Sequence, residues 1–295
     1  MKTKNYGVYT AKQLLTGYTK RQIKALVKAG KLQRIMRGWY TGADADPDVV
    51  RALKLGGRLG CLSGCAKYGL WVPYQAKTHV VLSNKVAVPA AEFTEFHRCA
   101  AHPHSPVFDL EDCLYQAMRY HDAETGLIVL ESALQLGHIG YDQAKRLASG
   151  VQKDKMTTYR FLDRGAQSGS ETRVRLFFQR RGVSVHTQNR TAPGWVDLLV
   201  GNSWIVECDG REFHDRPNAF EIDRERDLSN TAAGYLTTRL SYHQIWHEWE
   251  PYQTEAEHYF AQAPTPRFTQ GLRASRRLAG ECAEGLQYRL QLGWC

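Results

Sequence analysis

Residues 196–210 carry the strongest fold signal in the chain and read Val196-Asp197-Leu198-Leu199-Val200-Gly201-Asn202-Ser203-Trp204-Ile205-Val206-Glu207-Cys208-Asp209-Gly210. Two apolar runs flank the Gly-Asn-Ser sequence, whose composition is typical of a turn. The pattern predicts two antiparallel strands joined by a short hairpin loop. An acidic residue interrupts each apolar run, so the pairing of the strands decides where the two acids lie.

The length of the hairpin loop determines whether Asp197 and Glu207 face each other, because side chains alternate between the two faces of a strand. A two-residue loop would place them on opposite faces. A three-residue loop pairs Val200 with Trp204 and puts both acids on one face, together with Asp209. The Gly-Asn-Ser sequence suits the three-residue loop. We therefore expect the two carboxylates to meet.

Carboxylates inside apolar strands are costly to bury unless a cation compensates their charge. Magnesium and manganese ions prefer oxygen ligands, and a metal-bound water can attack a phosphodiester. Glu171 is a third candidate, because it lies at the start of a predicted helix after Ser168. The other interpretation of Glu171 is a capping box, in which its carboxylate accepts the Ser168 backbone N–H. We predict Asp197, Glu207 and Glu171 as ligands of Mg²⁺ or Mn²⁺.

The acids belong to a longer pattern, which consists of Ser168-x-x-Glu171, Gln188, Val196-Asp197-Leu198, Ile205-Val206-Glu207-Cys208-Asp209-Gly210, His214, Asp223-x-x-Arg226-Asp227, Gly234 and Thr238-Arg239. With this pattern, residues 168–245 resemble the very-short-patch repair endonuclease-like domains of the PD-(D/E)xK nuclease superfamily. The resemblance implies a restriction-endonuclease-like mixed sheet flanked by helices, with Asp197 and Glu207 holding Mg²⁺ for endonuclease activity. Asp209, which we also predict to be a catalytic residue, stands where the superfamily has a lysine. The repair endonucleases lack that lysine too and use a histidine, which His214 matches.

An imidazole that titrates near neutrality suits proton transfer, and we predict this role for His214. Asp223, Arg226 and Asp227 fall at helical spacing. We expect Arg226 to contact a phosphate, and the two acids to support His214 or the strand ends. The other interpretation of the trio is a solvated helix face with internal ion pairs.

The start of the chain is strongly basic. Residues 1–43 contain ten Lys and Arg and no acid, whereas the remainder has 29 basic and 30 acidic residues. The net charge of +9 therefore belongs to this segment, and a local positive field indicates a polyanionic partner. The alternative is a charged, solvated helix on a structural domain. The predicted DNA-binding residues are Lys20, Arg21, Lys24, Lys28, Arg34 and Arg37.

Local signals in the basic segment predict a winged helix-turn-helix. Thr10 begins a short helix, and Thr19 caps a second helix that ends before Gly30, with Ile23, Leu26 and Val27 as its buried stripe. Two short strands follow around Met36-Arg37. The segment 5–43 resembles the N-terminal domain of AbiEi-type antitoxins, which implies DNA binding. The matching residues are Gly7-Val8-Tyr9-Thr10, Leu14, Gly17-Tyr18-Thr19, Gly30-Lys31-Leu32 and Arg37-Gly38-Trp39-Tyr40.

The middle of the chain shows no expected site. Asp44-Ala45-Asp46-Pro47-Asp48 has the composition of a linker. Cys61 and Cys65, with histidines and a cysteine between 97 and 104, form a weak zinc pattern, because the three-residue gap is atypical. Small buried residues explain both cysteines equally well. The predicted elements are helices at 49–55, 63–70, 109–120 and 125–136 and a strand at 78–82.

The expected fold class is a multidomain α+β and α/β protein. Its predicted parts are a winged helix (1–43), a connecting mixed α/β region (44–160), a nuclease-like domain (161–262) and a basic tail (263–295). The seven scattered cysteines without a Cys-x-x-Cys pair, and the lack of a long apolar run, indicate a cytoplasmic protein without a membrane segment.

The first functional hypothesis is a Mg²⁺-dependent endonuclease that acts on double-stranded DNA. Its resemblance to antitoxins links it with phage defence or a toxin–antitoxin system. The alternative is an antitoxin-like transcriptional regulator with an inactive nuclease fold, which the replaced lysine favours. Enzymes that cut both strands commonly pair two sites, so the homodimer is an open expectation.

Overall fold

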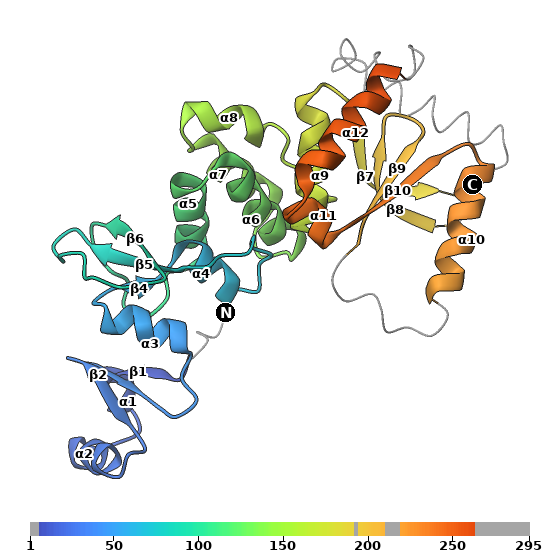
Figure 1. Ribbon diagram of the computed structural model, residues 1–295. Coiled ribbons are helices and arrows are strands. Elements are labelled where there is room, and N and C mark those ends of the chain that lie inside the picture. Colours follow the sequence, from blue (N-terminus) through green and yellow to red (C-terminus); the bar gives the residue numbers. More distant parts are fainter. Residues whose placement is uncertain (1–5, 192–193, 210–218, 263–295) are drawn as a thin grey trace. The chain divides into compact units, whose positions relative to one another are not determined.

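The computed structural model describes residues 6–191, 194–209 and 219–262, without the side chains of Asp209, 219–224 and 258–262. The described residues form two compact units, which divide between Val129 and Leu130. Across the described residues, three small sheets alternate with helices (Figure 1). This arrangement confirms the expected mixed α/β content.

The first unit begins with a small antiparallel sheet in the order β1-β3-β2. Its strands are β1 (Val8–Thr10), β2 (Gln33–Met36) and β3 (Trp39–Thr41), and helices α1 (Ala11–Leu14) and α2 (Lys20–Lys28) lie between β1 and β2 in the chain.

Thr10 and Thr19 form complete capping boxes with Gln13 and Gln22, which confirms both predicted helix starts. The predicted buried stripe of α2 is only partly right. Ile23 is buried against Leu14 and Leu32, and Leu26 is half-buried, but Val27 is 36% exposed. The helix packs on so small a core that only the Ile23 side is covered.

The rest of the first unit combines helices with a second small sheet. In this sheet β5 pairs antiparallel with β4 and parallel with β6. The elements are α3 (Pro47–Lys54), β4 (Arg58–Leu59), α4 (Cys61–Lys67), β5 (Thr78–Ser83), β6 (Thr94–Cys99), α5 (Leu110–Tyr120) and α6 (Ala123–Gln135), which continues into the second unit.

The segment expected as a linker is the start of α3. Asp46 caps this helix through the N–H groups of Asp48 and Val49, and Pro47 occupies its first turn. Val8 and Trp39 share one core with α3 and with β4 and β5. The basic segment is therefore packed against the residues that follow it, and α3 lies between the two small sheets (Figure 1).

The second unit is built on a mixed sheet in the order β10-β9-β8-β7. Strands β7, β8 and β9 are antiparallel, whereas β10 is parallel to β9, and α10 forms the crossover between these two. The elements are α7 (Tyr141–Ser149), α8 (Lys153–Tyr159), α9 (Gly169–Arg180), β7 (Val185–Thr191), β8 (Gly194–Val200), β9 (Trp204–Asp209), α10 (Ala219–Ala232), β10 (Leu236–Ser241), α11 (Tyr242–Trp246) and α12 (Trp249–Gln262).

Helices cover both faces of this sheet. Helices α9, α11 and α12 lie on one side and α10 on the other (Figure 1). Val174, Phe177 and Phe178 of α9 pack against Leu198 and Val206 in the larger core. Val196, Leu199 and Ile205 form a second, smaller buried cluster, against which Tyr235 packs.

Candidate functional site

The hairpin β8–β9 has the three-residue loop that the sequence predicts. Val200 pairs with Trp204. Asp197 and Glu207 then meet, because the Asp197 N–H donates to Glu207 Oε2 at 3.2 Å. The Cys208 N–H donates to Asp197 Oδ2 at 2.8 Å. Each carboxylate thus accepts a backbone N–H from the opposite strand, just beyond the last paired residues Leu198 and Val206. The expectation that the two acids meet is confirmed.

Burial and mutual repulsion make this pair of acids electrostatically costly. Glu207 is only 8% exposed. Burial first, and the charge of Asp197 second, raise the pKa of Glu207 to about 7, while Arg226 opposes the shift. The Arg226 Nη2 lies 3.5 Å from Glu207 Oε1 and donates to the Trp195 carbonyl at 2.5 Å. Arg226 therefore brings a positive charge to the acids from α10.

Glu171 joins the same cluster from the start of α9. The Ser168 hydroxyl accepts the Glu171 N–H, as expected for the N-cap, but the Glu171 carboxylate accepts the N–H of Gln167 at 3.0 Å. Gln188 Nε2 donates to Glu171 Oε2 at 3.2 Å and lies 3.5 Å from Asp197 Oδ1. Burial is the main cause that raises the pKa of Glu171 to about 7, and the charge of Asp197 adds to it.

Glu171, Asp197 and Glu207, with Gln188 and Arg226, are called the carboxylate cluster below. Gln188 entered the sequence pattern only through the nuclease resemblance. In the structure it has a φ of 45°, a left-handed conformation that a non-glycine residue seldom adopts. Such a conformation is retained where the surroundings impose it, and here the Gln188 amide connects two acids.

The other predicted site residues either make contacts elsewhere or lie outside the residues that the structure describes. Asp227 pairs with Arg239 on β10, with Nη2 and Oδ1 3.0 Å apart, so it supports a strand. Arg226, the basic member of the predicted trio, reaches Glu207, with Nη2 3.5 Å from Oε1. Asp209 ends β9 beside Ser241, but its side chain lies outside the described residues. The same holds for the side chain of Asp223 and for the whole of His214 and the tail 263–295.

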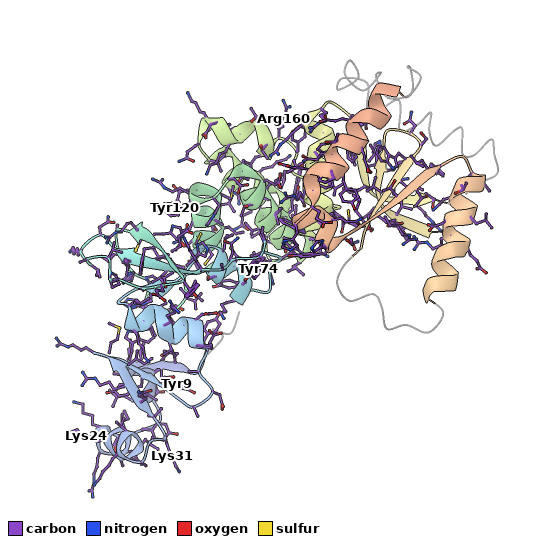
Figure 2. All side chains as sticks on the ribbon, viewed as in Figure 1. Tyr9, Lys24, Lys31, Tyr74, Tyr120 and Arg160 are labelled. Atoms are coloured by element: carbon purple, nitrogen blue, oxygen red, sulfur yellow. The ribbon has the colours of Figure 1, made fainter. Side chains whose placement is uncertain are left out.

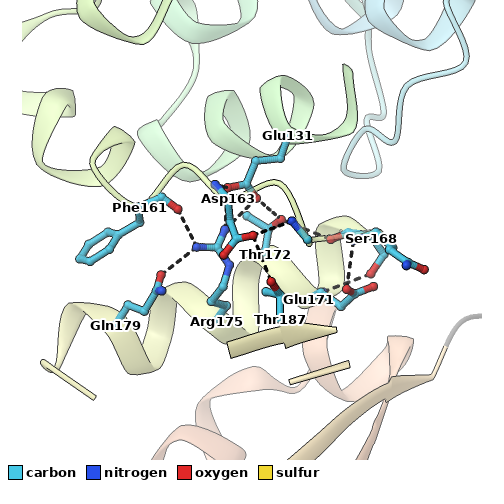
Figure 3. Close-up of polar contacts among 11 residues, drawn as sticks. Glu131, Phe161, Asp163, Ser168, Glu171, Thr172, Arg175, Gln179 and Thr187 are labelled. Atoms are coloured by element: carbon cyan, nitrogen blue, oxygen red, sulfur yellow. Dashed lines mark hydrogen bonds and ion pairs between the residues drawn. The ribbon is translucent and has the colours of Figure 1, made fainter. Parts of the chain in front are cut away.

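A buried ion pair that the sequence did not indicate holds α9 in place (Figure 3). Arg175 is fully buried, and its Nη2 binds both oxygens of Glu131 at 2.6 and 2.7 Å. The Thr172 hydroxyl and the Asp163 N–H also donate to the Glu131 carboxylate. Burial raises the pKa of Glu131, and Arg175 opposes that shift. Arg175 lies one turn after Glu171, so the pair fixes the helix that presents this acid.

The predicted DNA-binding residues are all exposed on the first unit. Lys20, Lys24 and Lys28 follow each other at intervals of four on α2 and therefore share one face. Arg34 on β2 and Arg37 in the following turn are exposed as well. Figure 2 shows Lys24 and Lys31 pointing away from the sheet formed by β1, β2 and β3. The described part of this segment presents cations on a helix and a neighbouring hairpin.

The middle region, where the sequence predicts no assembled site, brings four side chains of metal-binding residue types close together. Two of these residues, Cys61 and His97, belonged to the weak zinc pattern, and two did not. Burial raises the pKa of Cys61 to about 12 and lowers the pKa of His97 to about 4. The members of this Cys–His cluster are Cys61, His79, His97 and His121.

Comparisons with known proteins add no family. No protein-family model matches the chain, and no curated protein matches its sequence. Among the residues that the structure describes, no helix is both long and apolar enough to cross a membrane.

Proposed function

We propose that the protein binds double-stranded DNA and cleaves phosphodiester bonds as a divalent-metal-dependent endonuclease of the PD-(D/E)xK type. The observation that carries the proposal is the meeting of Asp197 and Glu207 on one face of the β8–β9 hairpin. The position of Glu171, bridged to Asp197 through Gln188, supports it. So does the order of the sheet, in which the two acids stand on central strands.

The donor set of the carboxylate cluster fits a hard divalent cation. Glu171 and Glu207 are 4% and 8% exposed, and burial, followed by the charge of Asp197, raises the pKa of both. Arg226 supplies one positive charge at 3.5 Å from one acid. The remaining negative charge is of the kind that Mg²⁺ or Mn²⁺ binds through carboxylate oxygens. Asp197, Glu207 and Glu171 would hold the ion.

The residues of the cluster have separable tasks. A bound Mg²⁺ would neutralise charge on the scissile phosphate and provide an activated water. Backbone N–H groups orient the Asp197 and Glu207 carboxylates, and the Gln188 amide orients Glu171. Arg226 is placed to exchange its contact with Glu207 for a phosphate oxygen, to which guanidinium binds well. Proton transfer by His214 remains part of the proposal from the sequence.

The basic segment supplies the means to hold DNA. The order of elements along the chain is α1, α2 and then the β2–β3 hairpin, which is the order of a winged helix. In this proposal α2 enters the major groove. Lys20, Lys24 and Lys28 on one face of α2 suit phosphate contacts, which position a protein without selecting a sequence. The resemblance to AbiEi-type antitoxins favours the same role and a cytoplasmic place in phage defence or a toxin–antitoxin system.

The test is cleavage of supercoiled plasmid with Mg²⁺, Mn²⁺ or EDTA by wild type and by the isosteric variants Asp197→Asn and Glu207→Gln. We expect metal-dependent nicking that both variants lose. Glu248→Gln is the matched control, because Glu248 is an exposed acid of the same unit that contacts His243. Cleavage that both cluster variants retain would refute the assignment of the site.

A second candidate function is a transcriptional regulator with an inactive nuclease fold, which Asp209 in the lysine position favours. This alternative predicts salt-sensitive binding to duplex DNA in wild type and in both cluster variants, without cleavage by any of them. A gel-shift assay on the same proteins tests the binding, and the plasmid assay distinguishes the regulator from the endonuclease by the absence of cleavage.

A further inference from the structure

The Cys–His cluster brings together four residues that are distant in the sequence. Cys61 is the first residue of α4, His79 lies on β5 and His97 on β6, and His121 follows the end of α5. Cys61 and His79 are fully buried, His97 is 5% exposed and His121 is half-buried. All four residues belong to the first unit, so the cluster is separate from the carboxylate cluster.

The distances within the cluster are close to those around a tetrahedral metal ion. The Cys61 Sγ lies 3.2 Å from His121 Nε2, and His79 Nδ1 lies 2.9 Å from His97 Nε2. The four ligand atoms all lie within 4.8 Å of one another. Bonds of about 2.0–2.1 Å to nitrogen and about 2.3 Å to sulfur give edges of about 3.3–3.6 Å in a zinc tetrahedron. No pair of ligand atoms exceeds these edges by more than about 1.5 Å, so side-chain rotations could bring all four atoms onto one ion.

The backbone around Cys61 points to the same conclusion. Cys61 has a φ of 50°, a left-handed conformation in the first residue of a helix, and its N–H donates to the Gln116 side chain at 2.8 Å. The thiol is thereby turned toward His121. Tyr120, next to His121 in the chain, stacks on the His97 ring with centroids 4.4 Å apart and so fixes a second member.

We propose that the Cys–His cluster is a structural zinc site with one thiolate and three imidazole ligands. Thiolate and imidazole donors favour Zn²⁺ and do not suit Mg²⁺, so the two metals of the protein would occupy different units. Four protein ligands leave no open position for a substrate, which is typical of structural zinc. The ion would join α4 and the end of α5 to strands β5 and β6, and so stabilise the unit that carries the basic segment.

The first test is the metal content and metal spectroscopy of the purified full chain. We expect one zinc per chain, and an X-ray absorption spectrum with one sulfur at about 2.3 Å and three nitrogens at about 2.0–2.1 Å. This measurement uses the wild-type protein and does not depend on how variants fold. Less than a tenth of an equivalent of zinc after expression in zinc-supplemented medium would overturn the proposal, as would a shell without sulfur.

The second test replaces zinc by cobalt, whose thiolate charge-transfer band reports the cysteine ligand. Cys61→Ala is expected to abolish this band. Cys65→Ala is the matched control, because Cys65 is equally buried one turn further along α4 but lies outside the cluster. Glu207→Gln, in the other unit, is expected to retain a full equivalent of zinc. A charge-transfer band that survives Cys61→Ala, or that is lost in Cys65→Ala instead, would contradict the proposed ligand set.

Discussion

Replacing Arg175 by methionine is expected to lower the free energy of unfolding of the second unit by about 3–5 kcal/mol. The substitution removes both contacts to the Glu131 oxygens, at 2.6 and 2.7 Å, and those to the Phe161 carbonyl and the Gln179 side chain. Glu131 is 1% exposed, so its charge would be left without a counterion in the interior. This loss is a large part of the roughly 5–15 kcal/mol that stabilises a typical domain.

The surroundings of Glu131 also predict a second substitution that restores part of the lost free energy of unfolding. Adding Glu131→Gln to Arg175→Met removes the unpaired charge, while the glutamine oxygen still accepts the Asp163 N–H and the Thr172 hydroxyl. We therefore expect the double variant to be more stable than Arg175→Met alone. Glu257→Gln is the control, because it breaks the ion pair with Arg181, the residue directly after α9. This pair is about half exposed and contributes at most about 1 kcal/mol.

Hydrogen exchange of the α9 amides is the appropriate assay, because two units need not unfold together. Protection of α9 is expected to fall in Arg175→Met, to recover partly in the double variant and to stay unchanged in Glu257→Gln. Additive losses in the double variant would refute the reasoning, since they would mean that the two side chains do not compensate each other.

Three further outcomes follow from the geometry. Because the pKa of Glu207 is raised in the folded state, the folded state binds more protons than the unfolded state. The free energy of unfolding, measured by urea titration in EDTA, should therefore fall as the pH rises from about 5 to 8. This fall should be smaller in Glu207→Gln. Lys20→Ala and Lys24→Ala should each reduce the slope of the logarithm of the DNA-binding constant against the logarithm of the salt concentration by about 0.9. Fluorescence anisotropy measures the binding constants. Gly64→Ala should destabilise the first unit by about 1–3 kcal/mol in thermal unfolding, because the added Cβ would overlap the buried Cys113 Sγ.

Local chemistry explains what could be predicted from the sequence. The Gly-Asn-Ser loop fixes a three-residue hairpin, and alternation along the strands then brings Asp197 and Glu207 together. Thr19 and Gln22 are three residues apart and specify a helix start by themselves. Such features depend on neighbours in the chain, so a pattern of residue types is enough to find them.

The features that sequence reasoning missed depend on distant contacts. Arg175 and Glu131 are 44 residues apart, and charged residues usually lie at the surface, so no spacing suggests their pairing. His79 and His121 join Cys61 only after two strands and a helix have packed. Asp46 was assigned to a linker by composition, although Asp-Pro is also a helix start. A local sign of the Cys–His cluster was that Cys61 and His97 both belong to the weak zinc pattern.

Binding of Mn²⁺ to the zinc-saturated full chain, measured by electron paramagnetic resonance at pH 8, tests most directly whether Asp197 and its neighbours form a metal site. Zinc saturation keeps the Cys–His cluster from contributing. We predict saturable binding in wild type, competition by Mg²⁺ and a large loss of affinity in Asp197→Asn. No saturable binding in wild type, or unchanged affinity in Asp197→Asn, would contradict the account.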